Sequence, residues 1–250
     1  MEELPNSICR LSSLKDLSLE YCPSLKSLPE SIGDLKSLVK FSLDGEKMEE
    51  LPNSICSLSS LKDLSLQYCL SLKCLPESIG DLKSLVKFSL SGAKMEELPN
   101  SICRLSSLKN LSLYECSSLK SLPESIGDLK SLVNFSLHGT KIEELPDSIC
   151  RLSSLETFDL NGMESLNRLP KAIGNLKCLV KLFLNQTNIK EVPNGVGWLK
   201  KLKLEDIGGL KGTKSLKQLS ISNCNTIADA GRKIIGQGTL LLADDDDDEI

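Results

Sequence analysis

Hydrophobic residues recur along this 250-residue chain with two short spacings that alternate. Leu17 and Leu19 lie two positions apart, so both side chains point to the same side of a short β-strand. Between Pro5 and Leu14 the spacing is three, the period of a 3₁₀-like or short helical segment, which a proline can start. Each unit therefore predicts one strand and one helical turn. The equivalents of the strand pair are Phe41 and Leu43, Leu64 and Leu66, Phe88 and Leu90, Leu111 and Leu113, Phe135 and Leu137, Phe158 and Leu160, Leu182 and Leu184.

The units form an internal repeat. Residues 1–47, 48–94 and 95–141 align without gaps, and the second and third blocks differ from the first at six and seven positions. A Leu-Pro pair recurs at alternating steps of 24 and 23 residues, and the apolar order is L-x-x-L-x-L-x-x-C-x-x-L followed by L-P-x-x-I-x-x-L. One coil cannot bury its apolar side alone, whereas stacked coils can. The pattern predicts an α/β solenoid, a leucine-rich-repeat horseshoe with a parallel concave β-sheet and short 3₁₀ or α segments on the convex side.

The repeat pattern sets the expected domain boundaries. About nine regular repeats of 23 or 24 residues and one irregular last repeat make a solenoid over 1–225, with a loop at about 205–215. A closing helix is expected over 226–236 and a disordered acidic tail over 237–250. Met1 falls inside a repeat, which favours a fragment or an array cut by a gene start. Leu4, Ile8, Leu11 and Leu14 would then lie on an uncapped first coil, open to self-association.

Composition excludes several classes of function. Leucine fills 50 positions and aromatic residues only 4%, so the core must be aliphatic. The lone histidine, His138, is expected to be an ordinary surface residue, and with one imidazole acid-base catalysis and a histidine metal site are both unexpected. We therefore predict no enzyme activity and no cofactor. No apolar run approaches the roughly 18 residues of a membrane span, and the first residues lack the features of a secretion signal.

Charge adds little to this picture. The net charge is −4, but residues 1–243 carry 30 basic and 28 acidic groups, and 30 − 28 leaves +2. No basic cluster of the kind that binds nucleic acid is present. The sequence therefore predicts a soluble cytoplasmic protein that binds neither nucleic acid nor membrane.

The cysteines follow the repeat. Cys9, Cys56, Cys103 and Cys150 share one site, and Cys22, Cys69 and Cys116 share another. Like cysteines lie two coils apart, roughly 10 Å, which is too far for a disulfide. We expect small, buried, reduced side chains in a reducing compartment, with Thr140 and Thr187 at the second site in other coils.

The three near-identical blocks differ at nine positions: Arg10, Asp16, Glu20, Tyr21, Pro23, Ser27, Lys40, Asp44 and Glu46. Tyr21 and Glu46 lie just beyond the strands, and Asp16, Glu20, Lys40 and Asp44 alternate with the core leucines. Such positions face the concave side. Exposed convex positions such as Glu30 and Lys36 do not change. The pattern predicts a concave face diversified for contact, centred on Tyr114, His138, Asp159, Asn161, Phe183 and Asn185. The full set of expected partner-binding residues is Asp16, Glu20, Tyr21, Lys40, Asp44, Asp63, Gln67, Tyr68, Lys87, Asn110, Tyr114, Asn134, His138, Asp159, Asn161, Lys181, Phe183 and Asn185.

Two phrases carry a family resemblance. Residues 25–33 read Leu-Lys-Ser-Leu-Pro-Glu-Ser-Ile-Gly, and residues 139–146 read Gly-Thr-Lys-Ile-Glu-Glu-Leu-Pro. Over nearly all of 1–225 the chain resembles the leucine-rich-repeat region of plant nucleotide-binding immune receptors, especially the Toll/interleukin-receptor class. It is also similar to plant intracellular Ras-group leucine-rich-repeat proteins. The near-identity of its repeats departs from the more diverged repeats of typical members.

The resemblance implies a non-enzymatic protein-recognition module of plant defence signalling. Its implied partners are a pathogen effector, a guarded host protein or the receptor's own switch domain. A freestanding cytosolic leucine-rich-repeat signalling scaffold is the alternative. No switch domain lies within these residues, so nucleotide exchange is not assigned to this chain.

Overall fold

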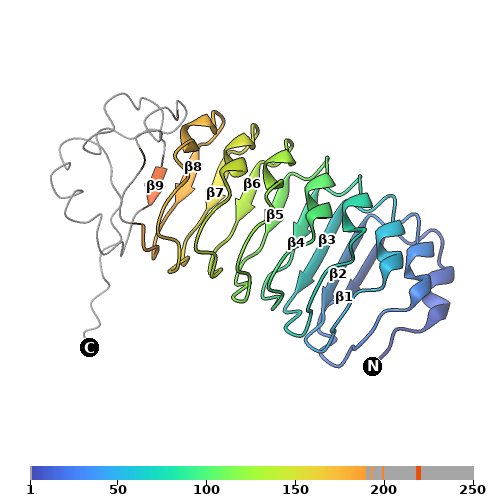
Figure 1. The fold of residues 1–250 in the computed structure, drawn as a ribbon. Coiled ribbons are helices and arrows are strands. Elements are labelled where there is room, and N and C mark those ends of the chain that lie inside the picture. Colours follow the sequence, from blue (N-terminus) through green and yellow to red (C-terminus); the bar gives the residue numbers. More distant parts are fainter. Residues whose placement is uncertain (1, 190–192, 194–198, 200–217, 221–250) are drawn as a thin grey trace, which may run out of the picture.

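The strands stack into one sheet in chain order. The computed structural model describes residues 2–189, 193, 199 and 218–220, and within them nine parallel strands are arranged from β1 to β9 (Figure 1). The strands are β1 Asp16–Leu19, β2 Lys40–Asp44, β3 Asp63–Gln67, β4 Lys87–Ser89, β5 Asn110–Ser112, β6 Asn134–Ser136, β7 Thr157–Asp159, β8 Lys181–Phe183 and β9 Gln218–Ser220. Because each coil contributes one strand in the same direction, the molecule is the predicted leucine-rich-repeat solenoid.

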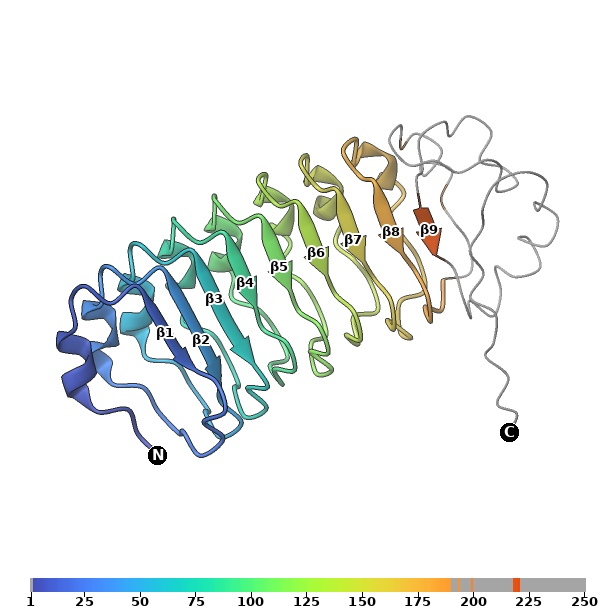
Figure 2. The same ribbon diagram turned by 180° about the vertical axis from the view of Figure 1, so that it is seen from behind.

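Short 3₁₀ helices line the opposite side of the stack (Figure 2). Five of them follow a proline whose extended backbone starts the turn: Pro5, Pro29, Pro52, Pro99 and Pro146. The fixed φ of proline and its missing N–H suit this position, which is why the spacing of three produces a turn here. The helices are η1 Asn6–Arg10, η2 Glu30–Asp34, η3 Asn53–Ser57, η4 Ile79–Asp81, η5 Asn100–Arg104, η6 Ile126–Asp128, η7 Asp147–Arg151 and η8 Ile173–Asn175.

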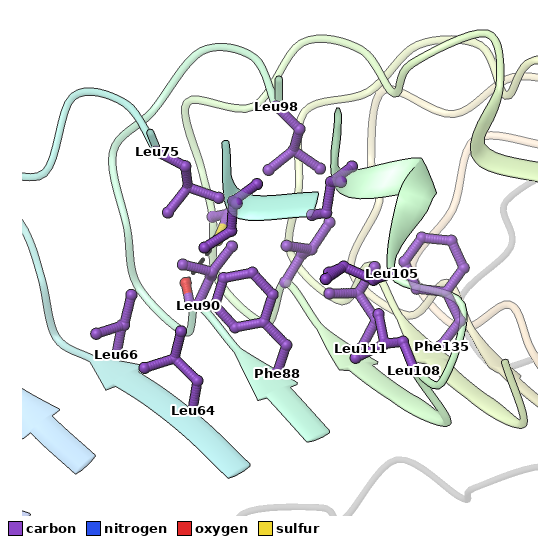
Figure 3. Close-up of a cluster of buried hydrophobic side chains, with 14 of the residues drawn as sticks. Leu64, Leu66, Leu75, Phe88, Leu90, Leu98, Leu105, Leu108, Leu111 and Phe135 are labelled. Carbon is purple, nitrogen blue, oxygen red and sulfur yellow. Dashed lines mark hydrogen bonds between the residues drawn. The ribbon is translucent and has the colours of Figure 1, made fainter. Parts of the chain in front are cut away.

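The core lies between the sheet and the 3₁₀ helices. Phe88 of β4 pairs in register with Leu64 and Leu111 of the neighbouring strands, and all three are buried (Figure 3). Every apolar strand pair from Leu17 to Leu184 is at most 7% exposed, which confirms the predicted inward direction. Phe135 and Phe158 also stack in neighbouring coils, with ring centroids 5.6 Å apart. The burial of this continuous apolar column is what holds the coils together.

Exposed ion pairs link neighbouring coils. Lys26 contacts Glu2 at 2.7 Å, and the contact recurs between Lys73 and Glu49 at 2.6 Å. The hydrogen bond from the lysine lowers the pKa of both Glu2 and Glu49. Such exposed pairs contribute little individually, because solvent screens the charges and two long side chains must be ordered. The further pairs are Lys120–Glu96, Arg168–Glu144, Arg104–Asp81 and Arg151–Asp128.

The cysteine prediction is confirmed for most positions and wrong for one. Six cysteines of the two repeat sites are buried, Cys22 is partly buried, and all the described cysteines are free thiols. Thr140 and Thr187 are buried at the equivalent place, as expected. Cys74, however, is exposed, because it replaces Ser27 at a position outside the apolar pattern.

The first coil is less open than expected. Leu4 is 6% exposed and Ile8 and Leu14 are partly buried against the core, whereas Leu11 is 52% exposed. The apolar surface expected to promote self-association is therefore concentrated at Leu11. Part of this burial follows from the bridge between Glu3 and Ser27, which holds the start of the described chain beside the second coil.

The C-terminal predictions fall mostly outside the described residues. The loop at 205–215, the closing helix at 226–236 and the acidic tail at 237–250 all lie there. The pattern resumes at β9, whose Leu219 pairs in register with Leu182 of β8. Among the described residues no helix has the length and apolar character that crossing a membrane requires.

Candidate binding surface

The outward side chains of the sheet form three columns across the strands. Parallel pairing in register places the same position of each coil side by side. The first column is Asp16, Lys40, Asp63, Lys87, Asn110, Asn134, Thr157 and Lys181. The central column is Ser18, Ser42, Ser65, Ser89, Ser112, Ser136, Asp159 and Phe183. The third column, directly after the second core residue, is Glu20, Asp44, Gln67, Ser91, Tyr114, His138, Asn161 and Asn185.

The first column changes character along the solenoid. Asp16 pairs with Lys40, and Asp63 with Lys87, so opposite charges alternate across neighbouring strands. The next coils replace the charges with amides, and the Nδ2 of Asn134 donates to the Oδ1 of Asn110 at 2.7 Å. The predicted placement of these residues on one wall is confirmed. Their role in binding a partner stays a prediction.

The sheet face is hollowed into one shallow depression that runs from the first coils to β8. Half of the eighteen predicted residues line it, and the others lie at its ends or where the strands end. The predicted residues that line it are Glu20, Lys40, Asp63, Gln67, Lys87, Asn110, Asn134, Asp159 and Phe183. The predicted residues outside it are Asp16, Lys181, Asp44, Tyr114, His138, Asn161, Asn185, Tyr21 and Tyr68.

Most strands are followed by a residue with a left-handed backbone conformation. The residue two positions after the second core side chain has a positive φ in seven coils among residues 2–189. Glycine supplies this conformation at Gly92, Gly139 and Gly162, but Tyr21, Tyr68, Glu115 and Gln186 adopt it without being glycine. Tyr21 is 89% exposed and Tyr68 60% exposed. The turn therefore directs both tyrosines to the rim of the sheet rather than onto its face.

His138 lies at the surface, as expected from the sequence, and also packs against neighbouring side chains. Its ring stacks on Tyr114, with centroids 4.6 Å apart and planes 26° apart. Nε2 lies 3.8 Å from a carboxylate oxygen of Glu115, and Nδ1 lies 3.9 Å from one of Asp159. The side chain keeps 27% of its surface exposed. Neighbouring coils thus hold the imidazole between two carboxylates.

Asp159 is the best-held carboxylate of this face. The Ser136 hydroxyl donates to its Oδ2 at 3.0 Å, and the backbone N–H of Asn161 donates to its Oδ1 at 3.1 Å. The Asn161 amide oxygen in turn accepts the backbone N–H of Asn185 at 2.8 Å. In the central column Asp159 pairs with Ser136 on one side and with the aromatic Phe183 on the other. We call Tyr114, Glu115, His138, Asp159 and Phe183 the β5–β8 cluster.

Sequence reasoning missed two residues of this surface. Thr157 lines the depression in the first column. It went unnoticed because it lies outside the three near-identical blocks. Glu115 reaches His138 only because its backbone is left-handed. The sequence offered a signal for both residues, because Thr157 lies two residues before Asp159 and Glu115 takes the place of Tyr21 and Tyr68 in the third block.

The surface carries little reactive chemistry. Among the described residues, no three His, Cys, Asp or Glu side chains are grouped to hold a metal ion. Burial raises the pKa of the Cys69, Cys116 and Cys150 thiols to about 11, so these cysteines are protonated core residues.

Comparisons with known proteins agree with the fold. No protein-family model matches the sequence. The leucine-rich-repeat domain of the type III effector XopL matches 80% of this chain and 70% of its own, with 24% identity and a TM-score of 0.63. Internalin C2 of Listeria monocytogenes matches 87% of this chain and 84% of its own, with 15% identity and a TM-score of 0.61. At these identities the likeness shows the fold alone.

One curated protein gives a more specific similarity. The TMV resistance protein N of Nicotiana glutinosa is 60% identical over 38 residues. The match spans 15% of this chain and only 3% of that protein's length. The chain is thus a leucine-rich-repeat solenoid whose sequence resembles the repeat region of plant nucleotide-binding resistance proteins.

Proposed function

We propose that this chain is a non-enzymatic protein-recognition module of a plant-immune-receptor-like protein, and that it binds its partner through the concave sheet. Solenoids of this fold typically serve as protein-binding scaffolds without enzyme activity. The similarity to a plant resistance protein favours a role in defence. The partner would be a pathogen effector, a guarded host protein or the receptor's own switch domain. Binding would take place in the cytoplasm.

One observation carries the proposal, the location of the differences between near-identical repeats. Among the first three blocks the changes include the positions of Asp16, Glu20, Lys40 and Asp44, all on the sheet face. Several exposed positions elsewhere stay constant, namely Glu2, Ser12, Lys15, Glu30, Asp34 and Lys36, whereas Arg10, Pro23 and Ser27 change. Neutral drift acts on all exposed positions alike. The bias therefore supports selection for contact on the concave face.

Site-specific photocrosslinking in plant leaf cells tests the proposal. A benzophenone amino acid replaces either Asn134, exposed on β6, or Asn175, exposed in η8 on the convex side. We expect a discrete crosslinked protein from position 134 and none from position 175. The crosslinked protein, once identified and purified, is then titrated against the chain.

Matched charge reversals complete the test. Lys87→Glu changes the concave wall, and Lys171→Glu makes the same change at an exposed position beside η8. We expect Lys87→Glu to weaken binding at least ten-fold and Lys171→Glu to leave it within two-fold. Crosslinking from Asn175 alone, or equal effects of the two reversals, would overturn the concave binding mode.

A further inference from the structure

Among the described residues, the two carboxylates of the β5–β8 cluster contact the His138 imidazole but no lysine or arginine. Glu115 and Asp159 flank the His138 imidazole, and Tyr114 covers one face of that ring. Within residues 2–189 neither carboxylate has a lysine or arginine nitrogen within 4 Å, although Lys141 and Lys181 lie nearby in sequence. Ion pairs elsewhere in the solenoid join lysines or arginines to exposed carboxylates. The cluster therefore lacks the lysine or arginine that pairs with carboxylates elsewhere in the solenoid.

The geometry of Asp159 favours a planar, forked donor. Each of its two oxygens already accepts one fixed hydrogen bond, from Ser136 or from Asn161, so the carboxylate plane is held in place. A carboxylate has about four lone-pair sites, which leaves one acceptor position free on each oxygen. A guanidinium can fill both positions with two parallel N–H donors, whereas an ammonium offers only a point charge.

The surroundings fit the rest of an arginine side chain. Phe183 lies in register with Asp159 on β8 and presents an aromatic surface in the depression. Arginine stacks its guanidinium plane on aromatic rings and packs its methylene stem on apolar surface. The side chain of Asp159 is only 24% exposed, so a charge placed beside it would be less screened than on an open surface.

Asp159 and Phe183 interrupt the serines of the central column. The column is serine in six coils and departs from serine only at Asp159 and Phe183 among β1 to β8. These two neighbours are a carboxylate and an aromatic ring, the pair that a guanidinium needs. We propose that the β5–β8 cluster binds an arginine side chain of the partner, an inference that rests on the proposed function of the concave sheet.

The single histidine of the protein provides a direct readout. The ¹H–¹³C correlation signal of the His138 ring is followed while Nα-acetyl-arginine methylamide is added, and the same titration is repeated with the citrulline and lysine analogues. We expect a saturable shift with the arginine compound and at least ten-fold weaker binding of citrulline, which has the same shape but no charge. Lysine should bind between the two.

Matched variants locate the site. Asp159→Asn should weaken arginine binding at least ten-fold, and Asp34→Asn, at an exposed position of η2 on the convex side, should leave it within two-fold. Asp159→Ser and Phe183→Ser restore the residue that six other coils carry, so they preserve the solenoid while removing the site. Equal binding of citrulline and arginine, unchanged binding by Asp159→Ser, or no saturable shift would overturn the proposal.

This titration needs no partner, so it separates the two proposals. If the arginine site is wrong and the proposed function is right, the crosslinked partner binds equally to the protein with and without Asp159→Ser. If the concave recognition is wrong, no partner crosslinks from Asn134, whatever the small compounds do.

Discussion

Gly127 lies directly against the backbone carbonyl of Ser148 in the next coil, so that a β-carbon on residue 127 would overlap its oxygen. The same relationship joins Gly33 to Ser54 and Gly80 to Ser101. The glycine that follows isoleucine in each of these three turns is thus a point of close approach between neighbouring coils on the convex side. Its small size, not a positive φ, explains its presence.

The contact between Gly127 and Ser148 predicts that adding one methyl group at residue 127 strongly lowers stability. Gly127→Ala should lower the free energy of unfolding by at least about 2 kcal/mol, because backbone rather than a flexible side chain must move. Urea denaturation followed by circular dichroism measures the change. Glu124→Ala, at an exposed position just before the same turn, is the control and should stay within about 0.5 kcal/mol. Equal stabilities of the two variants would contradict the close approach.

The left-handed turn at the end of β4 gives a second prediction. A β-carbon on Gly92 would meet nothing closer than 3.7 Å, so the cost of a side chain there is conformational. With a φ of 77°, Gly92→Ala should lower the free energy of unfolding by about 1 kcal/mol. Gly92→Asn should cost less, since asparagine tolerates this region. Calorimetry on both variants checks the order, and a larger loss for asparagine would point to a steric cause.

One missing arginine in the repeat can be restored. Arg104 pairs with Asp81 at 3.2 Å and Arg151 with Asp128 at 3.3 Å, but the equivalent partner of Asp34 is Ser57. Ser57→Arg should raise the free energy of unfolding by up to about 0.5 kcal/mol at low salt. The gain should vanish at about 1 M salt, where exposed pairs are screened. It should also vanish in the Asp34→Asn background, and its persistence there would assign it to another contact.

Buried thiols predict a dependence of stability on alkaline pH. Burial raises the pKa of Cys69, Cys116 and Cys150 from 9.0 to about 11. Between these values the native state holds protons that the unfolded state loses, so stability is full below pH 9 and falls as pH rises toward 11. Each thiol adds a slope of up to about 1.4 kcal/mol per pH unit.

Replacing the three cysteines isolates their contribution. The triple alanine variant should be less stable at pH 7 but should lose less stability between pH 9 and 11 than the parent protein. Urea denaturation at several pH values measures both slopes. Cys74→Ala is the control, because its exposed side chain gives no such reason for a change in slope. Equal slopes in the parent and triple variant would refute the assignment.

The strands, the turns and the inward residues could be predicted from the sequence alone. Leu17 and Leu19 are two apart and Pro5 to Leu14 step by three, and stacked coils are the arrangement that buries the apolar sides of both periods. In-register stacking then follows from the repeat, so the alignment of Asp16 with Lys40 could be predicted without coordinates. The prediction that Cys74 is buried was wrong, because cysteine is usually a buried residue type but position 74 lies outside the apolar pattern of the repeat.

The contacts between side chains of different coils follow only from the three-dimensional fold. Glu115 reaches His138 because its backbone turns left-handed, and Asp159 is a fixed acceptor because Ser136 of the preceding coil and the backbone of Asn161 in its own coil both donate to it. The contact of Gly127 with Ser148 likewise depends on the distance between coils. A one-dimensional period specifies which face a residue lies on. The contacts within that face depend on backbone angles and on the spacing of the coils, which the period does not contain.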